Sequence, residues 1–179
     1  MHTVPPAFLL TITIMKRNVI LIGMSGAGKS TLGVLLAKAL GKSFIDTDIL
    51  IQQHSGKLLQ EIIDTDGVDR FMSLEEEILS SLSVRNTVIA TGGSAVYSEK
   101  AMQALCKSGT VIYLRVGFDE LAQRVTNITT RGIVFKGNGD LLSVYQERLP
   151  LYERYADITL DSTHQGIEES VEMIVNALT

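Results

Sequence analysis

The sequence predicts a single α/β domain of three layers, in which a five-stranded parallel sheet lies between two layers of helices. A length of 179 residues corresponds to about one domain. Apolar residues make up 45% and charged residues 20%, which are ordinary fractions for a globular chain and exclude a disordered one. Short apolar runs alternate with segments of helical spacing, and this alternation is typical of a parallel sheet covered on both faces.

The first two strands and the helix between them follow from the pattern. Residues 19–22 are continuously apolar, as expected of a strand that is buried on both faces. A Gly-rich turn leads into residues 30–40, where apolar residues recur at helical spacing until Gly41, a residue type that commonly ends a helix. Residues 43–46 are predicted to form the second strand.

The chain between the second and third strands is predicted to be helical. Residues 48–66 give two short helices, because Ser55 and Gly56 interrupt the pattern. A longer helix is predicted over residues 69–83. Its apolar positions are Phe71, Met72, Leu74, Ile78, Leu79 and Leu82.

The rest of the chain repeats the alternation of strand and helix. The predicted strands are 87–90, 110–114 and 157–160, and the predicted helices are 99–107, 119–126, 141–155 and 166–178. Residues 127–140 break the pattern, and with Arg131, Lys136 and three glycines they predict a mobile lid loop. We therefore expect residues 16–179 to form one domain with this loop as a lid.

Residues 1–15 are interpreted as an N-terminal extension. They contain no charged residue, and Lys16 and Arg17 follow the apolar run, whereas a secretory signal begins with positive charge. The run is also too short to span a bilayer, so we expect no membrane partner. The segment is either a non-catalytic extension, or the natural chain begins at Met15.

The composition limits the classes of partner and the cellular compartment that we expect. Sixteen Lys and Arg stand against twenty Asp and Glu, for a formal net charge of −4, whereas a general nucleic-acid binder carries a basic field. The single cysteine, Cys106, cannot form an intramolecular disulfide, which indicates a reducing, cytoplasmic compartment. We expect a small-molecule substrate, no nucleic acid, and a monomer or weak oligomer.

The turn after the first strand carries the strongest motif. Residues 23–30, Gly-Met-Ser-Gly-Ala-Gly-Lys-Ser, match G-x-x-x-x-G-K-[ST] between a strand and a helix, which is the context that the motif requires. Glycines let backbone N–H groups turn toward a phosphate, and the helix N-terminus adds its dipole. Lys29 places a charge on the β- and γ-phosphates, and the Ser30 hydroxyl can ligate Mg²⁺. The expected nucleotide contacts are Gly26, Ala27, Gly28, Lys29, Ser30 and Thr31.

This P-loop predicts a nucleoside triphosphate site and a fold in the style of the nucleoside-monophosphate kinases. ATP is preferred to GTP, because the chain has no Asn-Lys-x-Asp stretch for guanine. Small P-loop proteins of this size are often kinases of small metabolites. Nucleotide switches and nucleoside-monophosphate kinases are the alternatives, although the Arg-rich clamp of the latter has no clear counterpart here.

Further motifs give a more specific resemblance. They are Asp46-Thr47-Asp48 after the second strand, Thr91-Gly92-Gly93 after the third, Arg124 and Arg131 at the long loop, and Arg148-Leu149-Pro150-Leu151-Tyr152 in the next helix. In order and spacing, together with the P-loop, they resemble shikimate kinase over roughly residues 16–178. The resemblance implies transfer of the γ-phosphate of ATP, with Mg²⁺, to a hydroxyl of a small polyhydroxylated metabolite, with shikimate as the best single expectation.

The resemblance implies roles for the two aspartates. Asp46 matches the residue that holds the Mg²⁺ shell, with a helix cap as the alternative. Asp48 matches the residue that binds substrate hydroxyls and orients or deprotonates the one that is attacked. Because alternate residues of an extended segment point the same way, we expect both carboxylates on one side of the chain.

The same resemblance implies roles for the glycine turn and three arginines. Gly92 and Gly93 match a turn that lies against the substrate ring, and Arg148 matches an arginine that grips the substrate carboxylate. Arg131 matches the lid arginine that closes over the phosphates, and Arg124 matches a residue that stacks on the adenine. An ordinary turn, a structural salt bridge and solvated surface arginines are the alternatives.

Three positions depart from the family pattern. In the family, an arginine follows the aromatic residue of the helix over 69–83 and holds the substrate carboxylate together with the residue matched by Arg148. Here Phe71 and Glu75 match, but Met72 occupies the arginine position. Met72 either lines a pocket for a less anionic ring or is a plain core methionine.

The other two departures are Ser94, in place of the third glycine of the turn, and Gly132, in place of the proline after the lid arginine. The three departures leave two alternatives to shikimate phosphorylation. One is a related kinase with a different small-alcohol substrate, and the other is a non-catalytic ATP-binding regulator.

Overall fold

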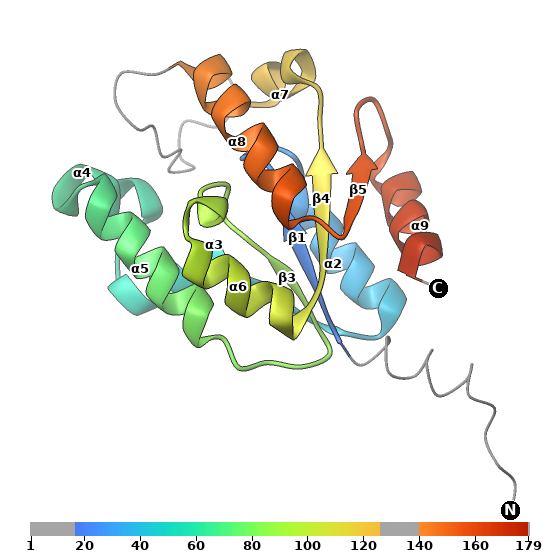
Figure 1. Ribbon diagram of the computed structural model, residues 1–179, viewed down its shortest axis with the longest axis horizontal. Coiled ribbons are helices and arrows are strands. Elements are labelled where there is room, and N and C mark those ends of the chain that lie inside the picture. Colours follow the sequence, from blue (N-terminus) through green and yellow to red (C-terminus); the bar gives the residue numbers. More distant parts are fainter. Residues whose placement is uncertain (1–16, 126–139, 179) are drawn as a thin grey trace, which may run out of the picture.

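A computed structural model describes residues 17–125 and 140–178 (Figure 1). Within these ranges one parallel sheet has the strand order β2-β3-β1-β4-β5. Its strands are β1 (Asn18–Ile22), β2 (Ser43–Asp46), β3 (Thr87–Ala90), β4 (Gly109–Arg115) and β5 (Ile158–Asp161). The predicted five-stranded parallel sheet is confirmed. Each strand could be located from its own apolar run, without knowledge of the strands beside it.

Helices cover both faces of the sheet. On one face, α2 (Lys29–Leu40) packs against α9 (Ile167–Leu178) (Figure 1). The opposite face carries α5 (Val68–Ser81), α6 (Glu99–Ser108) and α8 (Leu141–Tyr155). The three-layer α/β prediction is therefore confirmed as well.

Four shorter helical segments complete the described chain. They are α3 (Thr47–Ser55), α4 (Leu59–Asp66), the 3₁₀ turn η1 (Ala95–Tyr97) and α7 (Phe118–Val125). The break between α3 and α4 falls at Gly56, whose φ of 70° is left-handed and ends α3. The η1 turn was not predicted, because a single turn is too short to show a helical period.

Two apolar clusters hold these elements in place. The larger cluster is centred on β1 and β4 and extends to the helices on both faces. The smaller cluster lies between α3, α4 and α5. Its buried members are Ile51, Leu59, Ile62, Phe71, Leu74 and Ile78. It fixes α3 against α5, and the position of Asp48 relative to Glu75 depends on this contact.

The segment Asp46-Thr47-Asp48 differs from the extended conformation that we predicted. Strand β2 ends at Asp46, and α3 begins at Thr47. The Asp46 carboxylate accepts a hydrogen bond from the Asp48 N–H at 3.0 Å and caps the helix. Strand β2 therefore ends where we predicted, but α3 begins one residue earlier than expected, so the alternation of an extended segment does not apply to Asp46 and Asp48.

Two predicted segments fall wholly or almost wholly outside the described residues. The extension over residues 1–15 is one of them, and the lid over 127–140 is the other, apart from Asp140. The Asp140 carboxylate accepts a hydrogen bond from the Ser143 N–H at 2.8 Å and caps α8.

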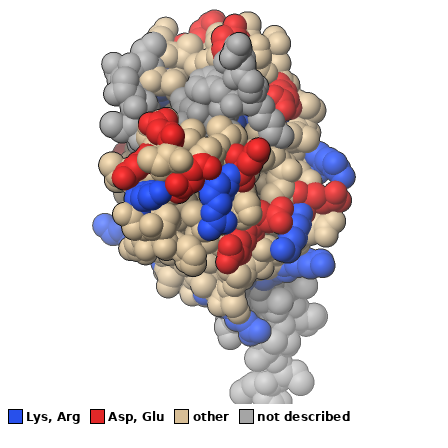
Figure 2. All heavy atoms as spheres, turned by 90° about the vertical axis from the view of Figure 1, so that its left-hand side faces the viewer, with Lys and Arg blue, Asp and Glu red and all other residues tan. Residues whose placement is uncertain are grey.

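Two properties of the described ranges bear on the partners. No helix of residues 17–125 and 140–178 is long and apolar enough to cross a membrane. On the face that carries α4 and α5, acidic and basic side chains are interspersed (Figure 2). The described part of that face therefore offers no continuous basic surface.

Candidate active site

The turn between β1 and α2 has the geometry of an anion site. Gly26 and Gly28 adopt φ values of 87° and 94°, which residues other than glycine rarely adopt. Gly28 is the N-cap of α2, and no side chain caps this helix end. The dipole of α2 favours an anion at this helix end.

Two of the P-loop side chains, Lys29 and Ser30, line a pocket at this turn. Lys29 is buried, and its ammonium donates to the carbonyls of Gly23 at 2.7 Å and Met24 at 2.8 Å. These bonds hold a positive charge against the loop. Ser30 lines the same pocket as Lys29, whereas Thr31 is exposed and lines neither of the two pockets at this loop.

Two pockets meet at the P-loop, and Gly28 lines both. The first, which we name the acceptor pocket, is lined by Ser25, Gly26, Gly28, Lys29, Ser30, Asp48, Phe71, Thr91, Gly92, Gly93, Ser94 and Arg148. The second, which we name the nucleoside pocket, is lined by Ala27, Gly28, Leu32, Arg124, Ser162, Gln165, Ile167 and Ser170. A phosphate chain on the P-loop would therefore have its two ends in different pockets.

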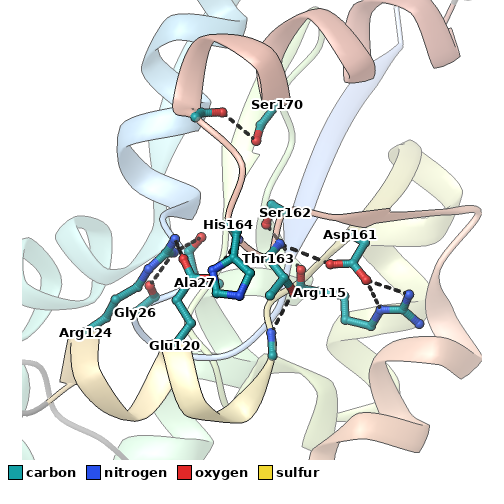
Figure 3. A network of polar contacts seen from close by, with 12 residues as sticks. Gly26, Ala27, Arg115, Glu120, Arg124, Asp161, Ser162, Thr163, His164 and Ser170 are labelled. Atoms are coloured by element: carbon teal, nitrogen blue, oxygen red, sulfur yellow. Dashed lines mark hydrogen bonds and ion pairs between the residues drawn. The ribbon is translucent and has the colours of Figure 1, made fainter.

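A polar network fixes Arg124 at the nucleoside pocket (Figure 3). Its guanidinium donates to the carbonyls of Gly26 at 3.4 Å and Ala27 at 3.5 Å, and it pairs with Glu120 on the previous turn of α7. Glu120 also accepts from the His164 N–H at 2.7 Å, and this bond, together with Arg124, lowers the pKa of Glu120. The predicted adenine-stacking residue thus sits at this pocket, held by protein groups on two sides.

The glycine turn after β3 forms one wall of the acceptor pocket. The Gly92 N–H donates to Thr47 Oγ1 at 3.2 Å, and the Gly93 carbonyl accepts from the Tyr152 hydroxyl at 2.6 Å. A Cβ on Gly93 would lie 2.8 Å from Ser25 Oγ and 3.1 Å from Arg148 Nη1. Glycine is favoured at this position because a side chain would crowd Ser25 and Arg148.

Arg148 is a second cation of the acceptor pocket, besides Lys29. It is 1% exposed although it carries a full charge. Its guanidinium lies 5.0 Å from the centre of the Tyr97 ring, and Nε donates to the Tyr97 hydroxyl at 3.2 Å. The unpredicted η1 turn therefore has a function in the site, because it supplies the ring that positions this arginine.

Glu75, which lies next to Gly92 of this pocket, received no role from the sequence pattern. It is 2% exposed, and Oε2 accepts from the Ser94 hydroxyl at 2.6 Å. Burial raises its pKa to about 7, and the negative charge of Asp48 adds to the effect, whereas the Ser94 hydrogen bond opposes it. A signal was present in the sequence, because Glu75 occupies position i+4 of an apolar face that begins at Phe71 and continues at Leu74.

Besides Thr31, two predicted site residues of the described ranges line neither pocket, and a third lies outside those ranges. Asp46 caps α3 and is not among the lining residues. Met72 is half-buried and packs against the smaller apolar cluster, which favours the core interpretation of this residue. Arg131 and the neighbouring Gly132 lie outside the described residues, and the lid role of Arg131 stays a prediction.

A P-loop flanked by two pockets at the carboxyl edge of a parallel sheet defines a P-loop kinase of small molecules, which transfers phosphate to a hydroxyl. A family model described as "Shikimate kinase" matches residues 25–179. The chain therefore belongs to the shikimate kinase family.

Curated relatives and solved structures agree with this assignment. The chain is 37% identical to a shikimate kinase of Chromobacterium violaceum over 164 residues, which cover 90% of this chain and 89% of that one. It is 38% identical to a protein named "Shikimate kinase 2" of Yersinia enterocolitica over 173 residues, which cover 92% and 97%.

The solved structure of the Acinetobacter baumannii shikimate kinase in complex with shikimate matches with a TM-score of 0.86 at 28% identity, and the match covers 93% of this chain and 95% of that one. A gluconokinase of Sinorhizobium meliloti matches with a TM-score of 0.53 at 21% identity and shares the fold alone.

Proposed function

We propose that the protein transfers the γ-phosphate of ATP to a hydroxyl of shikimate, giving shikimate 3-phosphate and ADP. The observation that carries the proposal is the position of Gly28, which lies between a pocket with Arg124 and a pocket with Asp48 and Arg148. This position supports a P-loop that lies between a nucleoside and an acceptor. Membership of the shikimate kinase family supports the choice of acceptor.

The P-loop residues bind and polarise the phosphates. The first N–H groups of α2 lack a side-chain cap and would hold the β- and γ-phosphates, and Lys29 would turn its ammonium from the loop carbonyls to the phosphate oxygens. The transferred phosphoryl group carries dispersed negative charge, so fixed donors of this kind lower the barrier. Arg131 is the further cation that we expect over the phosphates.

Asp48 and Arg148 position the acceptor. Arg148 binds a carboxylate best when its guanidinium is fixed beforehand, and Tyr97 fixes it here. Asp48 lines the same pocket and would accept a hydrogen bond from the attacking hydroxyl and take its proton. Gly92 and Gly93 allow the acceptor to lie directly against the backbone.

The residues at the P-loop also fit a magnesium ion. Ser30 offers a hydroxyl inside the pocket and Asp46 a carboxylate at the end of β2, and both are oxygen ligands of the kind that Mg²⁺ takes. When bound with ATP, Mg²⁺ neutralises phosphate charge. Asp46 already caps α3, so one carboxylate would serve both roles.

The test is steady-state release of ADP with Mg·ATP and titrated shikimate, with the product identified by mass. Arg148→Met should lower kcat/KM for shikimate by about 10- to 150-fold, because a charge-assisted hydrogen bond is lost. The matched control is Arg154→Met, an exposed residue of the same helix. A wild-type protein that binds Mg·ATP but releases no ADP with shikimate would overturn the proposal.

A further inference from the structure

The stretch of α8 that contains Arg148 also contains Tyr152, a residue that has no role in the reaction proposed above. The two residues stand four positions apart, a spacing that places them on the same side of a helix. Tyr152 is fully buried and lines neither of the two pockets. Its ring stacks on the ring of Tyr113 in β4, with ring centres 5.0 Å apart and 20° between the planes. The core therefore fixes where the Tyr152 hydroxyl lies.

The Tyr152 hydroxyl has a single proton, and its contacts indicate where that proton goes. The hydroxyl donates to the Gly93 carbonyl at 2.6 Å, which is a short hydrogen bond. The Met24 thioether lies 3.7 Å from the same hydroxyl, but sulfur is a weaker acceptor than a carbonyl. With the proton directed to Gly93, the lone pairs of the hydroxyl oxygen can accept a hydrogen bond from another donor.

Arg148 is that donor. Burial raises the pKa of Tyr152, whereas the charge of Arg148 and a side-chain hydrogen bond with Arg148 lower it. The positions of the groups agree with this bond. Arg148 Nη1 lies 3.1 Å from the place that a Cβ on Gly93 would take, and the Tyr152 hydroxyl is bonded to the Gly93 carbonyl. The guanidinium and the hydroxyl therefore meet beside Gly93.

Arg148 is thus held by the hydroxyls of two tyrosines. Its Nε donates to the Tyr97 hydroxyl at 3.2 Å, and its guanidinium also hydrogen-bonds to Tyr152. Both hydroxyls are neutral, so they orient the guanidinium without cancelling its charge. An arginine that is oriented beforehand loses less conformational entropy when it binds a carboxylate. Because Arg148 and Gly93 line the acceptor pocket, this arrangement prepares the pocket for a carboxylate.

We propose that Tyr152 is a positioning residue of the acceptor pocket, and that its hydroxyl fixes Arg148 for acceptors that carry a carboxylate. Tyr152 acts through Arg148 and does not touch the acceptor. The inference rests on the phosphoryl transfer to shikimate proposed above. Because the carboxylate takes no part in the bond changes, a weaker contact to it should appear in KM for the acceptor and not in kcat.

The test is the steady-state kinetics of Tyr152→Phe, which keeps the stacked ring and removes the hydroxyl. We expect KM for shikimate to rise by about 3- to 10-fold, the size of one net hydrogen bond, while kcat and KM for Mg·ATP stay unchanged. The matched control is Tyr145→Phe on the same helix, because the Tyr145 hydroxyl also donates to a backbone carbonyl, that of Val116, at 3.2 Å. Tyr145 lines neither pocket, so the control should keep all three constants.

A double-mutant cycle shows whether Tyr152 acts through Arg148. In the Arg148→Met background, Tyr152→Phe should change kcat/KM for shikimate by less than about twofold, since the group that Tyr152 positions is already gone. A full additional loss in that background would overturn the inference, because Tyr152 would then support the pocket in general.

Tyr97→Phe keeps the inference testable if Tyr152→Phe does not fold. It removes the other hydroxyl that holds Arg148, and it should raise KM for shikimate over the same range. An unchanged KM in Tyr97→Phe would then show that Arg148 needs no hydroxyl to position it, which overturns the inference. The thermal midpoints of the variants check the fold.

The outcomes separate this inference from the proposed function. A rise of KM for shikimate in Tyr152→Phe that is absent from Tyr145→Phe supports the inference. An unchanged KM in folded Tyr152→Phe, or an equal rise in both variants, overturns it and leaves the proposed function standing as long as the wild type phosphorylates shikimate. A wild type that binds Mg·ATP but releases no ADP with shikimate overturns the proposed function, and the inference with it.

Discussion

The nucleoside pocket and the acceptor pocket share Gly28 but differ in how their charged groups are satisfied. At the nucleoside pocket, Arg124 pairs with Glu120, and Glu120 also accepts a backbone N–H (Figure 3). At the acceptor pocket, Glu75 has one oxygen bonded to Ser94 and the other without a hydrogen-bond partner among the described residues. The charged pair at the nucleoside pocket is thus satisfied by protein groups, whereas one buried carboxyl oxygen beside the acceptor pocket is not.

This difference shows where specificity is determined. A pocket whose polar groups already have protein partners depends less on a ligand to satisfy them. A pocket with an unsatisfied buried group favours the ligand that satisfies it and disfavours those that do not. The acceptor side should therefore determine which substrate is used, at some cost in stability.

The largest effect should come from the group that both pockets depend on. Lys29→Met removes the ammonium at the shared P-loop and should lower kcat by about 100- to 1,000-fold with any acceptor, the size expected when a preorganised donor to transition-state charge is lost. Lys38→Met, an exposed residue of the same helix, is the control. A loss confined to one acceptor would show that Lys29 acts on the acceptor side alone.

The elements that the sequence predicted well are those encoded locally. The strands, the P-loop and most helix ends follow from runs of a few residues, and the structure confirms them. The predicted start of α3 was one residue late. The Asp46 side chain accepts a hydrogen bond from the Asp48 N–H, and this local bond starts the helix at Thr47.

Glu75 could not be assigned from the pattern for a different reason. Its hydrogen bond to Ser94 spans 19 positions of the chain, and its approach to Gly92 depends on how α5 packs beside β3. The sequence shows only an acid on an apolar face. The lid residue Arg131 was assigned by resemblance, and no contact of the described residues bears on it.

The next effect concerns stability and tests whether Glu75 is truly unsatisfied. Its pKa is about 7 in the fold against a usual value of 4.5, so the fold binds its proton more tightly than the unfolded chain. Stability should therefore be lost as the pH rises from about 4.5 to 7, and the loss should persist above that range. Two and a half pKa units correspond to about 3 kcal/mol.

Urea unfolding at about pH 5 and about pH 8 measures this effect. The free energy of unfolding of the wild type should fall by about 3 kcal/mol more between these pH values than that of Glu75→Gln, which cannot ionise. Glu76→Gln should retain the wild-type dependence. Equal slopes in all three proteins would mean that the carboxyl has a partner in solution.

A substitution at Met72 should give the buried Glu75 carboxyl the partner that it lacks among the described residues. Met72 lies three residues before Glu75 on α5, and residues at this spacing are neighbours on a helix surface. Met72→Arg should give Glu75 a charged partner and raise kcat/KM for shikimate by about 10-fold. Met173→Arg, an exposed residue of α9, is the control. A less stable protein with unchanged kinetics would instead show that Met72 only packs in the smaller apolar cluster.

The smallest effect should be found at the nucleoside pocket. Arg124→Ala should raise KM for ATP by about two- to fivefold, the size of an exposed cation–π contact to a base, because a third of the Arg124 side chain is open to solvent. Arg115→Ala, which removes the neighbouring surface pair with Asp161, is the control. A rise of more than about 50-fold would break the comparison between the pockets, since a contact of the exposed kind cannot supply it. Arg124 would then act on the phosphates through the carbonyls of Gly26 and Ala27 as well as on the base.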